Sequence, residues 1–392
     1  MDFTTVPGRV PNYLAGRASE IAAVQDSLQT HDNLLLMGLR GTGKTTLLSK
    51  AESIASGQGW AVLSTYLDEG GLLDRVSMKL DLLTAGRAHK RFAGAQATVL
   101  GTGAGFDLAS SEPRATIDTQ IETLIQKRKV PGLLITIDEV HATVGAAQQH
   151  LRTLGNEIQL AQRRNLPVVA MMAGLPGGIR ALLANKDENE RLTAATFLRR
   201  AAKLPIGEIS LYDVKAEYER AARENDLRIS EANLELLARS AGGYSYLFQL
   251  LGRHVWRLAS HHVITESNIR GGLRYARRDL GEAIKDTALG ELSKVDRSFM
   301  LAMAQWESND VPVGFVREYL GVSKQYVNNY RRRLLDSDMI TAHDGTLRFA
   351  LPYMRDFLRE YAASQPDDDD WPEDWRSTLP NPPVPVNTSK QR

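Results

Sequence analysis

A glycine-rich stretch between an apolar run and an amphipathic segment is the feature that most constrains the fold of this chain. Residues 37–48 read MGLRGTGKTTLL and match the pattern G-x-x-x-x-G-K-T. In this pattern, backbone N–H groups cradle phosphate oxygens, the lysine reaches the β- and γ-phosphates, and the threonine hydroxyl binds Mg²⁺. Residues 33–38 have the length of a strand, and residues 44–55 carry apolar side chains at helical spacing. The sequence therefore predicts an α/β fold with a phosphate-binding loop.

The residues expected to contact a nucleotide follow from this pattern. ATP and Mg²⁺ are the expected cofactors, with Thr45 as a metal ligand and Lys44 as a catalytic cation. The predicted loop contacts are Gly38, Arg40, Gly41, Thr42, Gly43, Lys44, Thr45 and Thr46.

Three more apolar runs predict buried parallel strands, at 60–68, 132–139 and 167–174. Their alternation with helical patterns favours a parallel sheet with helices on both faces. The run LLITIDE ends in Asp138 and Glu139, at the carboxyl end of a strand, where open α/β sheets bind ligands. We expect Asp138 to hold the metal and Glu139 to act as the base that polarises the attacking water.

The second half of the chain has a different pattern. From about residue 211 the sequence is helical, and residues 311–352 predict helix, turn, helix and hairpin, as in a winged helix-turn-helix. Gly321 is expected in the turn, Ser323 at a helix N-cap, and Asp344-Gly345 in the hairpin. The residues from 365 onward are acidic and proline-rich, and are expected to be disordered. Residues 86–115 are expected to form a loop or a hairpin.

Composition narrows the function classes. The 392 residues carry a net charge of +1, so any contact with nucleic acid must come from a local patch. The absence of cysteine excludes disulfides and thiolate metal sites and is typical of a reducing compartment. The first residues resemble no secretory leader, and no apolar run approaches 18 residues. We expect a cytoplasmic protein with no membrane partner.

With these motifs the chain resembles the AAA+ P-loop ATPases, in particular the archaeal-ATPase and origin-recognition-like branch that is related to the STAND signalling ATPases. The resemblance rests on the loop, on LLITIDEVH and on four further motifs: LAGRASEI (14–21), MAGLP (172–176), TFLRRA (196–201) and GGYSYLFQLLG (242–252). It also rests on the winged-helix segment that ends in LRFALPYMRDFL (347–358). It implies a five-stranded AAA+ domain (1–210), a helical lid (211–284), a winged helix (285–364) and the disordered tail (365–392).

The resemblance also implies further site residues. Gly16 and Arg17 would lie near the adenine. Arg199 or Arg200 would act on the γ-phosphate of a neighbouring subunit, although two solvated arginines at a helix end explain this sequence equally well.

Two departures from the family matter. After the fourth strand this chain offers only Ala173 and Gly174 where many relatives sense the γ-phosphate, and GGYSY lacks the usual lid arginine, with Ser245 in place of proline. Because positioned charge supplies most of the catalysis in phosphoryl transfer, we expect tight binding and slow turnover, as in a switch.

The winged helix is the expected output of this switch. The residues expected to contact duplex DNA are Lys324, Gln325, Asn328, Arg331, Arg332, Arg333 and Arg348. Residues 321–349 carry only five basic against three acidic residues, which is a weak electrostatic footprint. The alternative is a signalling or defence scaffold, in which ATP drives self-association and the winged helix binds a protein partner.

Overall fold

A computed structural model gives the structure of most of the chain. It describes residues 3–6, 8–67, 71–86, 115–140, 146–184, 194–284 and 292–364. The expected tail and almost all of the expected loop at 86–115 lie outside these residues. The chain divides between Gly207 and Glu208 into two compact units. We call them the sheet unit (residues up to 207) and the helical unit (residues from 208).

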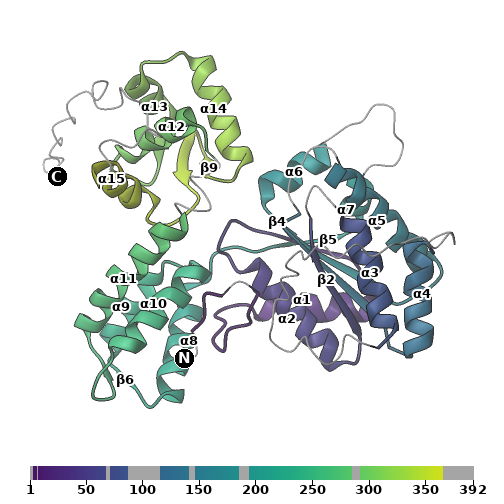
Figure 1. The fold of residues 1–392 in the computed structure, drawn as a ribbon. Coiled ribbons are helices and arrows are strands. Elements are labelled where there is room, and N and C mark those ends of the chain that lie inside the picture. Colours follow the sequence, from purple (N-terminus) through teal and green to yellow (C-terminus); the bar gives the residue numbers. More distant parts are fainter. Residues whose placement is uncertain are drawn as a thin grey trace, which may run out of the picture. The chain divides into compact units, whose positions relative to one another are not determined.

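The sheet unit is built on five parallel strands in the order β2-β3-β4-β1-β5 (Figure 1). The strands are β1 (Leu34–Met37), β2 (Ala61–Tyr66), β3 (Leu133–Asp138), β4 (Val168–Gly174) and β5 (Ala202–Pro205). All seven residues of β4 and the first five of β3 are buried, as expected for inner strands covered on both faces. The predicted parallel sheet is confirmed, with a strand in each of the three predicted ranges. The prediction of burial was wrong for β2, because β2 is an edge strand whose Ser64 and Tyr66 are exposed.

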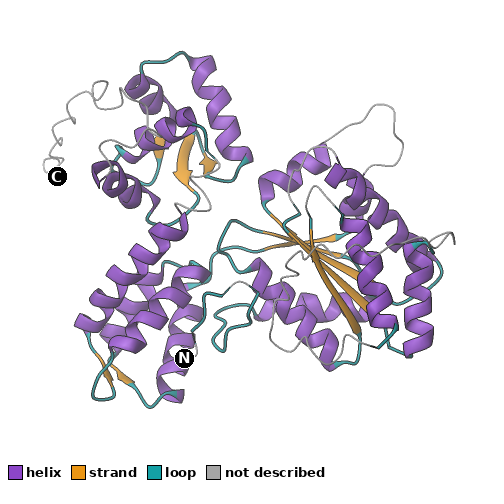
Figure 2. Cartoon of the chain, viewed as in Figure 1, coloured by secondary structure: helices purple, strands orange, loops and turns teal. Residues whose placement is uncertain are grey.

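Helices cover both faces of this sheet (Figure 2). They are α1 (Ala18–Thr30), α2 (Lys44–Gly57), α3 (Leu72–Thr84), α4 (Ile117–Arg128), α5 (Ala146–Arg163), α6 (Pro176–Ala184) and α7 (Ala194–Arg200). Side chains of α1 and α2, such as Val24 and Leu47, share one apolar core with Leu36 of β1. Side chains of α3, α4, α5, α6 and α7 form the core on the other face.

The helical unit begins with four helices, which we call the helical segment. They are α8 (Leu211–Glu224), α9 (Glu231–Ala241), α10 (Ser245–Leu258) and α11 (Glu266–Ile284), and the short parallel pair β6 (Arg228–Ile229) and β7 (Val263–Ile264) joins two of their loops. Ser210 and Ser230 cap α8 and α9 by accepting backbone N–H groups with their side chains. Among the described residues, no helix is long and apolar enough to cross a membrane.

Residues 292–364 form the second part of the helical unit, which we call the C-terminal module. Its elements are α12 (Lys294–Ala304), β8 (Val311–Pro312), α13 (Val313–Leu320), α14 (Lys324–Asp336), β9 (Ile340–His343), β10 (Thr346–Phe349) and α15 (Met354–Ser364). The three strands form an antiparallel sheet in the order β8-β10-β9.

The turns of this module follow the sequence closely. Gly321 ends α13 in the left-handed conformation, and the Ser323 side chain accepts the N–H of Tyr326 at the start of α14. Asp344 and Gly345 both have positive φ, 44° and 81°, as a type I′ hairpin turn requires. The predicted turn, cap and hairpin are confirmed at these residues.

The helix α15 joins the C-terminal module to the helical segment. The Tyr353 hydroxyl donates to the Ser240 carbonyl of α9 at 3.0 Å, and the Arg277 guanidinium of α11 lies 4.0 Å from the centre of the Tyr353 ring. Gly281 leaves space for Phe357, since a Cβ at Gly281 would lie 2.8 Å from that ring. The helical segment and the module are therefore packed together within one compact unit.

Candidate nucleotide-binding site

The phosphate-binding loop joins β1 to α2, and its backbone requires glycine at three positions. Gly41 and Gly43 have φ of 72° and 94°, a conformation that other residues rarely adopt. A Cβ at Gly38 would lie 2.5 Å from the Ile206 carbonyl oxygen. The spacing of glycines in the motif is thus explained by the path of the loop against β5 and the residue that follows it.

The first turn of α2 presents backbone donors to this loop. Gly43 is the N-cap and has no side chain that could accept the N–H groups of the first turn. The Lys44 ammonium donates to the carbonyl oxygens of Gly38 and Leu39, at 2.8 and 2.9 Å. A helix N-terminus and a lysine therefore converge on the same loop, which is an arrangement that attracts phosphate.

Thr45 and Asp138 belong to separate elements and are joined by a hydrogen bond. The Thr45 hydroxyl donates to Asp138 Oδ2 at 2.6 Å, although 93 residues separate the two in sequence. Thr45 lies in the first turn of α2, and Asp138 is the last residue of β3, beneath that helix. A hydroxyl and a carboxylate at this distance can share one Mg²⁺, which prefers a few protein oxygens together with water and phosphate.

Glu139 follows in an unusual backbone conformation. Its φ is 59°, in the left-handed region that a non-glycine residue adopts at a cost of about 1–3 kcal/mol. Its backbone N–H donates to Asp138 Oδ1 at 2.8 Å, and its side chain is exposed. The backbone thus turns sharply at the end of β3 and directs an accessible carboxylate outward beside the metal-side acid.

These residues fit Mg²⁺-ATP. The motif predicts three features that are present here. The loop has no room for a Cβ at Gly38, the start of α2 has no side-chain cap, and Thr45 contacts Asp138. The remaining predicted loop contacts, Arg40, Thr42 and Thr46, lie within the same loop and first turn, and Thr42 Oγ1 donates to the Leu39 carbonyl at 2.9 Å.

Arg17 lies beside the loop and is almost completely buried, with 4% of its surface exposed. Its guanidinium donates to the carbonyl oxygens of Thr42 at 3.1 Å and Gly207 at 2.7 Å, and to Glu20 Oε1 at 2.6 Å. Burial alone would raise the pKa of Glu20, but hydrogen bonds from Ser19 and Arg17 outweigh it, and the pKa is lowered. Arg17 therefore fastens the loop to the last residue of the sheet unit, a role that the sequence did not reveal.

A steric restriction explains why Gly174, where a γ-phosphate sensor was predicted to be missing, carries no side chain. A Cβ at Gly174 would lie 1.9 Å from the Val140 carbonyl oxygen, because Val140 follows the strand next to β4. Val140 N–H in turn donates to the Ala173 carbonyl at 2.8 Å. No side chain can be accommodated at Gly174 unless the backbone moves.

Arg199 and Arg200 lie at the opposite edge of the sheet from the loop. They end α7 and directly precede β5, whose first residue pairs with Leu34, the first residue of β1. The loop leaves β1 at its other end, about 10 Å further along the strand. Both side chains are exposed, and that of Arg199 donates to the Leu183 carbonyl. Their action on a neighbouring subunit stays a prediction.

Tyr66 and Arg75 are residues near the site that the sequence did not single out. Tyr66 ends β2 and pairs in register with Asp138, yet 52% of its surface is exposed. The Arg75 guanidinium lies 4.6 Å from the centre of its ring and donates to its carbonyl oxygen. The sequence signal for Tyr66 was an aromatic residue at the end of a predicted strand. Such a residue more often lies in the core, so it did not indicate a site.

Most of the predicted DNA contacts lie on the surface of α14. Val327 and Leu334 are buried, as predicted, and Tyr330 is half-buried. The exposed members of the predicted set are Lys324, Gln325, Asn328, Arg332, Arg333 and Arg348, whereas Arg331 is half-buried.

Two of these arginines are engaged within the module. Arg333 donates to the buried Asp296 carboxylate at 2.8 Å, and Arg348 forms two hydrogen bonds with Asp310, which lower the pKa of Asp310. Residues 292–364 carry ten basic and nine acidic side chains. The module is therefore nearly neutral, and two of the predicted contact arginines are paired with its own acids.

Comparison with known proteins agrees with this geometry in the sheet unit. Residues 13–169 match the family of the AAA ATPase domain, and residues 285–358 match a domain of unknown function (DUF8462). No curated protein matches the chain. The sheet unit is thus a P-loop AAA+ domain.

One solved structure shows a similar fold at low sequence identity. A Walker-type ATPase of Pyrococcus abyssi is similar at 15% identity and a TM-score of 0.66, over 92% of this chain and 100% of that one. Two others have lower TM-scores. A RuvB variant of Thermotoga maritima reaches 0.45, at 16% identity over 88% and 95% of the chains. The Aeropyrum pernix Orc1 protein in complex with DNA reaches 0.45, at 15% identity over 91% and 94%.

Proposed function

We propose that this chain is an ATP-controlled switch that binds Mg²⁺-ATP tightly and hydrolyses it slowly. The observation that carries the proposal is the 2.6 Å contact between Thr45 and Asp138 beside the Lys44 loop. It brings the two parts of a magnesium–phosphate site together from separate elements. The AAA ATPase domain match over residues 13–169 supports the same activity.

Each residue of the site has a role in this proposal. Lys44 and the N–H groups of α2 bind and orient the phosphates, and Thr45 and Asp138 hold the metal. Mg²⁺, when bound, neutralises charge on the transferring phosphoryl group. Glu139 accepts the proton of the attacking water, for which its exposed side chain is accessible.

Slow turnover is expected from two features of the sequence. Gly174 has no room for a polar side chain next to β3, and the motif GGYSY, in which the resemblance places a lid arginine, has Ser245 and no arginine. Each missing donor removes charge stabilisation that is made only in the transition state. Binding is less affected, since the loop and α2 supply it.

Arg17 links the phosphate-binding loop to the last residue of the sheet unit, after which the helical unit follows in the chain. Arg17 contacts the loop at Thr42 and the unit boundary at Gly207. The helical segment and the C-terminal module pack together through Tyr353 and Phe357. The helical segment and the module should therefore respond as one body if ATP binds one conformation of the chain more tightly than another.

The proposed activity is tested by measuring ATP turnover together with thermal unfolding. We expect ATP to stabilise the chain by about 4 kcal/mol at a thousandfold excess over Kd. Lys44→Ala abolishes both stabilisation and turnover, whereas Lys50→Ala, on the same helix but away from the loop, changes neither. Equal ATP stabilisation of the two variants would contradict the proposal.

Duplex DNA is the first candidate for the output. Lys324, Gln325, Asn328 and Arg332 are exposed on α14 and suit base edges and phosphates. We expect ATP and DNA to strengthen each other's binding, with affinity falling steeply as salt rises. Fluorescence anisotropy of a labelled duplex tests this, and equal affinity with ATP, ADP and no nucleotide would contradict it.

ATP-driven self-association with a protein partner is the second candidate. Two observations favour it: the ion pairs of Arg333 and Arg348, and the position of Arg199 and Arg200 at the sheet edge away from their own loop. Mass measurement by light scattering, with and without ATP, tests it. Arg199→Ala and Arg200→Ala should each lower ATP-dependent assembly or turnover, and unchanged values in both would count against this candidate.

A further inference from the structure

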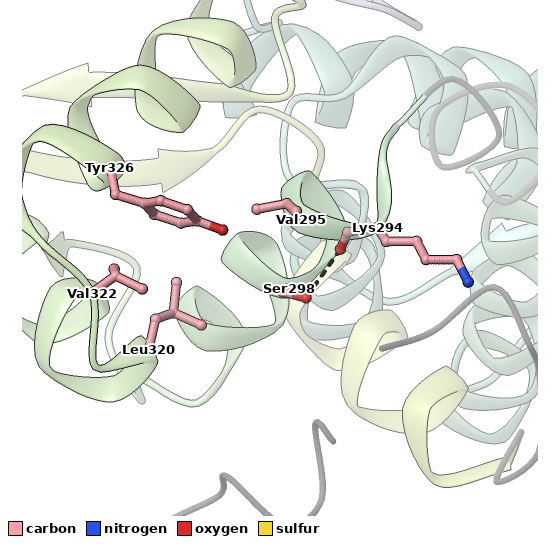
Figure 3. A pocket seen from close by; sticks show the side chains of 6 residues that line it. All are labelled: Lys294, Val295, Ser298, Leu320, Val322 and Tyr326. Atoms are coloured by element: carbon pink, nitrogen blue, oxygen red, sulfur yellow. Dashed lines mark hydrogen bonds between the residues drawn. The ribbon is translucent and has the colours of Figure 1, made fainter. Parts of the chain in front are cut away.

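The C-terminal module contains a hollow of about 280 Å³ at the start of α14 (Figure 3). It is bordered by α12, by the turn after α13 and by the first turn of α14. The residues that line it are Lys294, Val295, Ser298, Leu320, Val322 and Tyr326. The site lies in the part of the module that carries Lys324 and Gln325, two of the predicted DNA contacts.

The lining of this hollow is mostly apolar. The Tyr326 ring extends across it toward Val295, and Leu320 and Val322 point into the same space (Figure 3). The Ser298 hydroxyl donates a hydrogen bond to the Lys294 carbonyl oxygen at 3.0 Å. Burial raises the pKa of Tyr326. A flat aromatic side chain suits such a space better than a sugar or a phosphate does.

The rim of the hollow is basic. The ammonium of Lys294 points away from the apolar lining, and Lys294 and Lys324 are both exposed. Arg297 is half-buried on α12, and the acid of that helix turn, Asp296, is buried and paired with Arg333. Glu318 is an exposed acid on α13 and opposes this charge in part. The local excess of positive charge favours an aromatic group that is flanked by acids.

The chain itself contains a segment with this chemistry. Residues 367–375 read DDDDWPEDW, with six acids, no basic residue and two tryptophans. Trp371 has acids on both sides in sequence. This segment combines large aromatic side chains with negative charge, which the basic rim of the hollow would attract.

The segment is close enough along the chain to reach the hollow. The helix α15 contacts the end of α12 through Arg359, whose Nε donates to the Ala304 carbonyl, and it ends five residues later at Ser364. The hollow lies at the other end of α12, which is about 16 Å long. Trp371 follows Ser364 by seven residues, a span of about 23 Å when extended. Trp375, four residues further on, can reach farther still.

We infer that residues 367–375 bind this hollow within the same chain, with the Trp371 indole against Tyr326, Val295 and Val322, and with the flanking acids on the basic rim. The bound segment lies beside Lys324 and Gln325 at the start of α14. The inference depends on neither ATP hydrolysis nor DNA binding.

The chain lacks cysteine, which allows a direct test by site-specific disulfide formation. The test uses the full chain with Ser298→Cys in the hollow and Pro372→Cys next to Trp371. Under mild oxidation, we expect a disulfide within one chain that forms at least tenfold faster than in two control pairs. The first control pairs Pro372→Cys with Ala342→Cys, at an exposed position of strand β9. The second pairs Ser298→Cys with Ser389→Cys near the chain end.

Two further changes test the chemistry of the contact. Adding Trp371→Ala to the first pair should slow disulfide formation at least fivefold, while Trp371→Phe slows it less, since an aromatic ring remains. Raising the salt concentration to 0.5 M should also slow it, because the acids and the rim are exposed to solvent.

Three results would overturn the inference. Equal rates in the test and control pairs would mean that the segment meets the module only by random collision. Disulfides that link two chains, at rates rising with concentration, would place the segment of a second copy in the hollow. An unchanged rate with Trp371→Ala would remove the indole as the anchor. Retained ATP stabilisation of these variants shows that such results do not bear on the nucleotide site.

Discussion

The sheet unit and the C-terminal module use their charged side chains in opposite ways. At the carboxyl edge of the sheet, Lys44 binds carbonyl oxygens of the phosphate-binding loop, Thr45 contacts Asp138, and the neighbouring Glu139 side chain is exposed. In the module, Arg333 and Arg348 bind acids of the module itself. A charged residue in a backbone-defined motif is thus a better guide to a ligand than a charged residue on a helix surface.

The largest effect is expected where the sheet unit performs chemistry. Glu139→Gln should reduce ATP turnover by about 10²–10⁴-fold, because it removes the base but keeps the size of the side chain. ATP should still stabilise the variant against thermal unfolding. Turnover measured under saturating ATP gives the answer, and wild-type rates in Glu139→Gln would assign the base to another residue. Glu122→Gln, on α4, is a matched control that should leave turnover unchanged.

The next effect concerns a buried charge of the sheet unit. Arg17→Met leaves Glu20 buried without its cation, and we expect it to destabilise the chain by about 3–5 kcal/mol. Arg9→Met, at an exposed position, should change stability by less than about 0.5 kcal/mol. Chemical denaturation measures both. Equal effects in the two variants would mean that the Arg17 contacts do not stabilise the fold.

The pair of Arg17 and Glu20 also predicts a pH dependence. The pKa of Glu20 is lowered in the folded chain, so its contribution is present above its ordinary pKa and is lost as pH falls through the lowered value. The stability difference between wild type and Arg17→Met should therefore shrink in acid. A difference that stays constant between pH 7 and pH 3 would exclude this linkage.

A smaller effect is expected at Gly174. Gly174→Ala places a methyl group against the Val140 carbonyl and should cost about 1–3 kcal/mol. Gly57→Ala, at the end of α2 with no atom within 4 Å of the new Cβ, should stabilise by up to about 1 kcal/mol. Thermal unfolding of both variants compares a crowded with an open glycine. If Gly174→Ala is as stable as wild type, the Val140 carbonyl does not restrict the side chain at position 174.

The smallest effect on stability is expected in the C-terminal module. Asp310→Asn removes the acid that binds Arg348, and we expect no measurable change in the unfolding midpoint because the pair is exposed. If the module binds DNA, releasing Arg348 should raise the slope of affinity against salt by about one phosphate contact. An unchanged slope would show that Arg348 does not contact the duplex.

Much of the sheet unit could be predicted because its signals are local and sterically strict. The strands β3 and β4 are continuous apolar runs, and the loop glycines have conformations that other residues rarely adopt. The position of Asp138 at a strand end was enough to predict its meeting with Thr45. Other elements with strict local requirements, such as the hairpin at Asp344-Gly345, could be predicted equally well.

The remaining features depend on partners that are distant in sequence. Arg17 contacts Gly207, which is 190 residues away, and Arg348 contacts Asp310 through the register of a small sheet. No pattern within either segment indicates these contacts. For the same reason, the sequence could not show that Asp296 binds Arg333 of α14.

The backbone of Glu139 has a consequence for protein engineering. Glycine adopts its φ of 59° without strain, so Glu139→Gly relieves strain at the cost of the carboxylate. A screen for thermostable variants would therefore favour the loss of the proposed base, whereas a screen for turnover would reject it. Libraries of this chain should hold position 139 fixed, since selection for stability alone would enrich inactive variants.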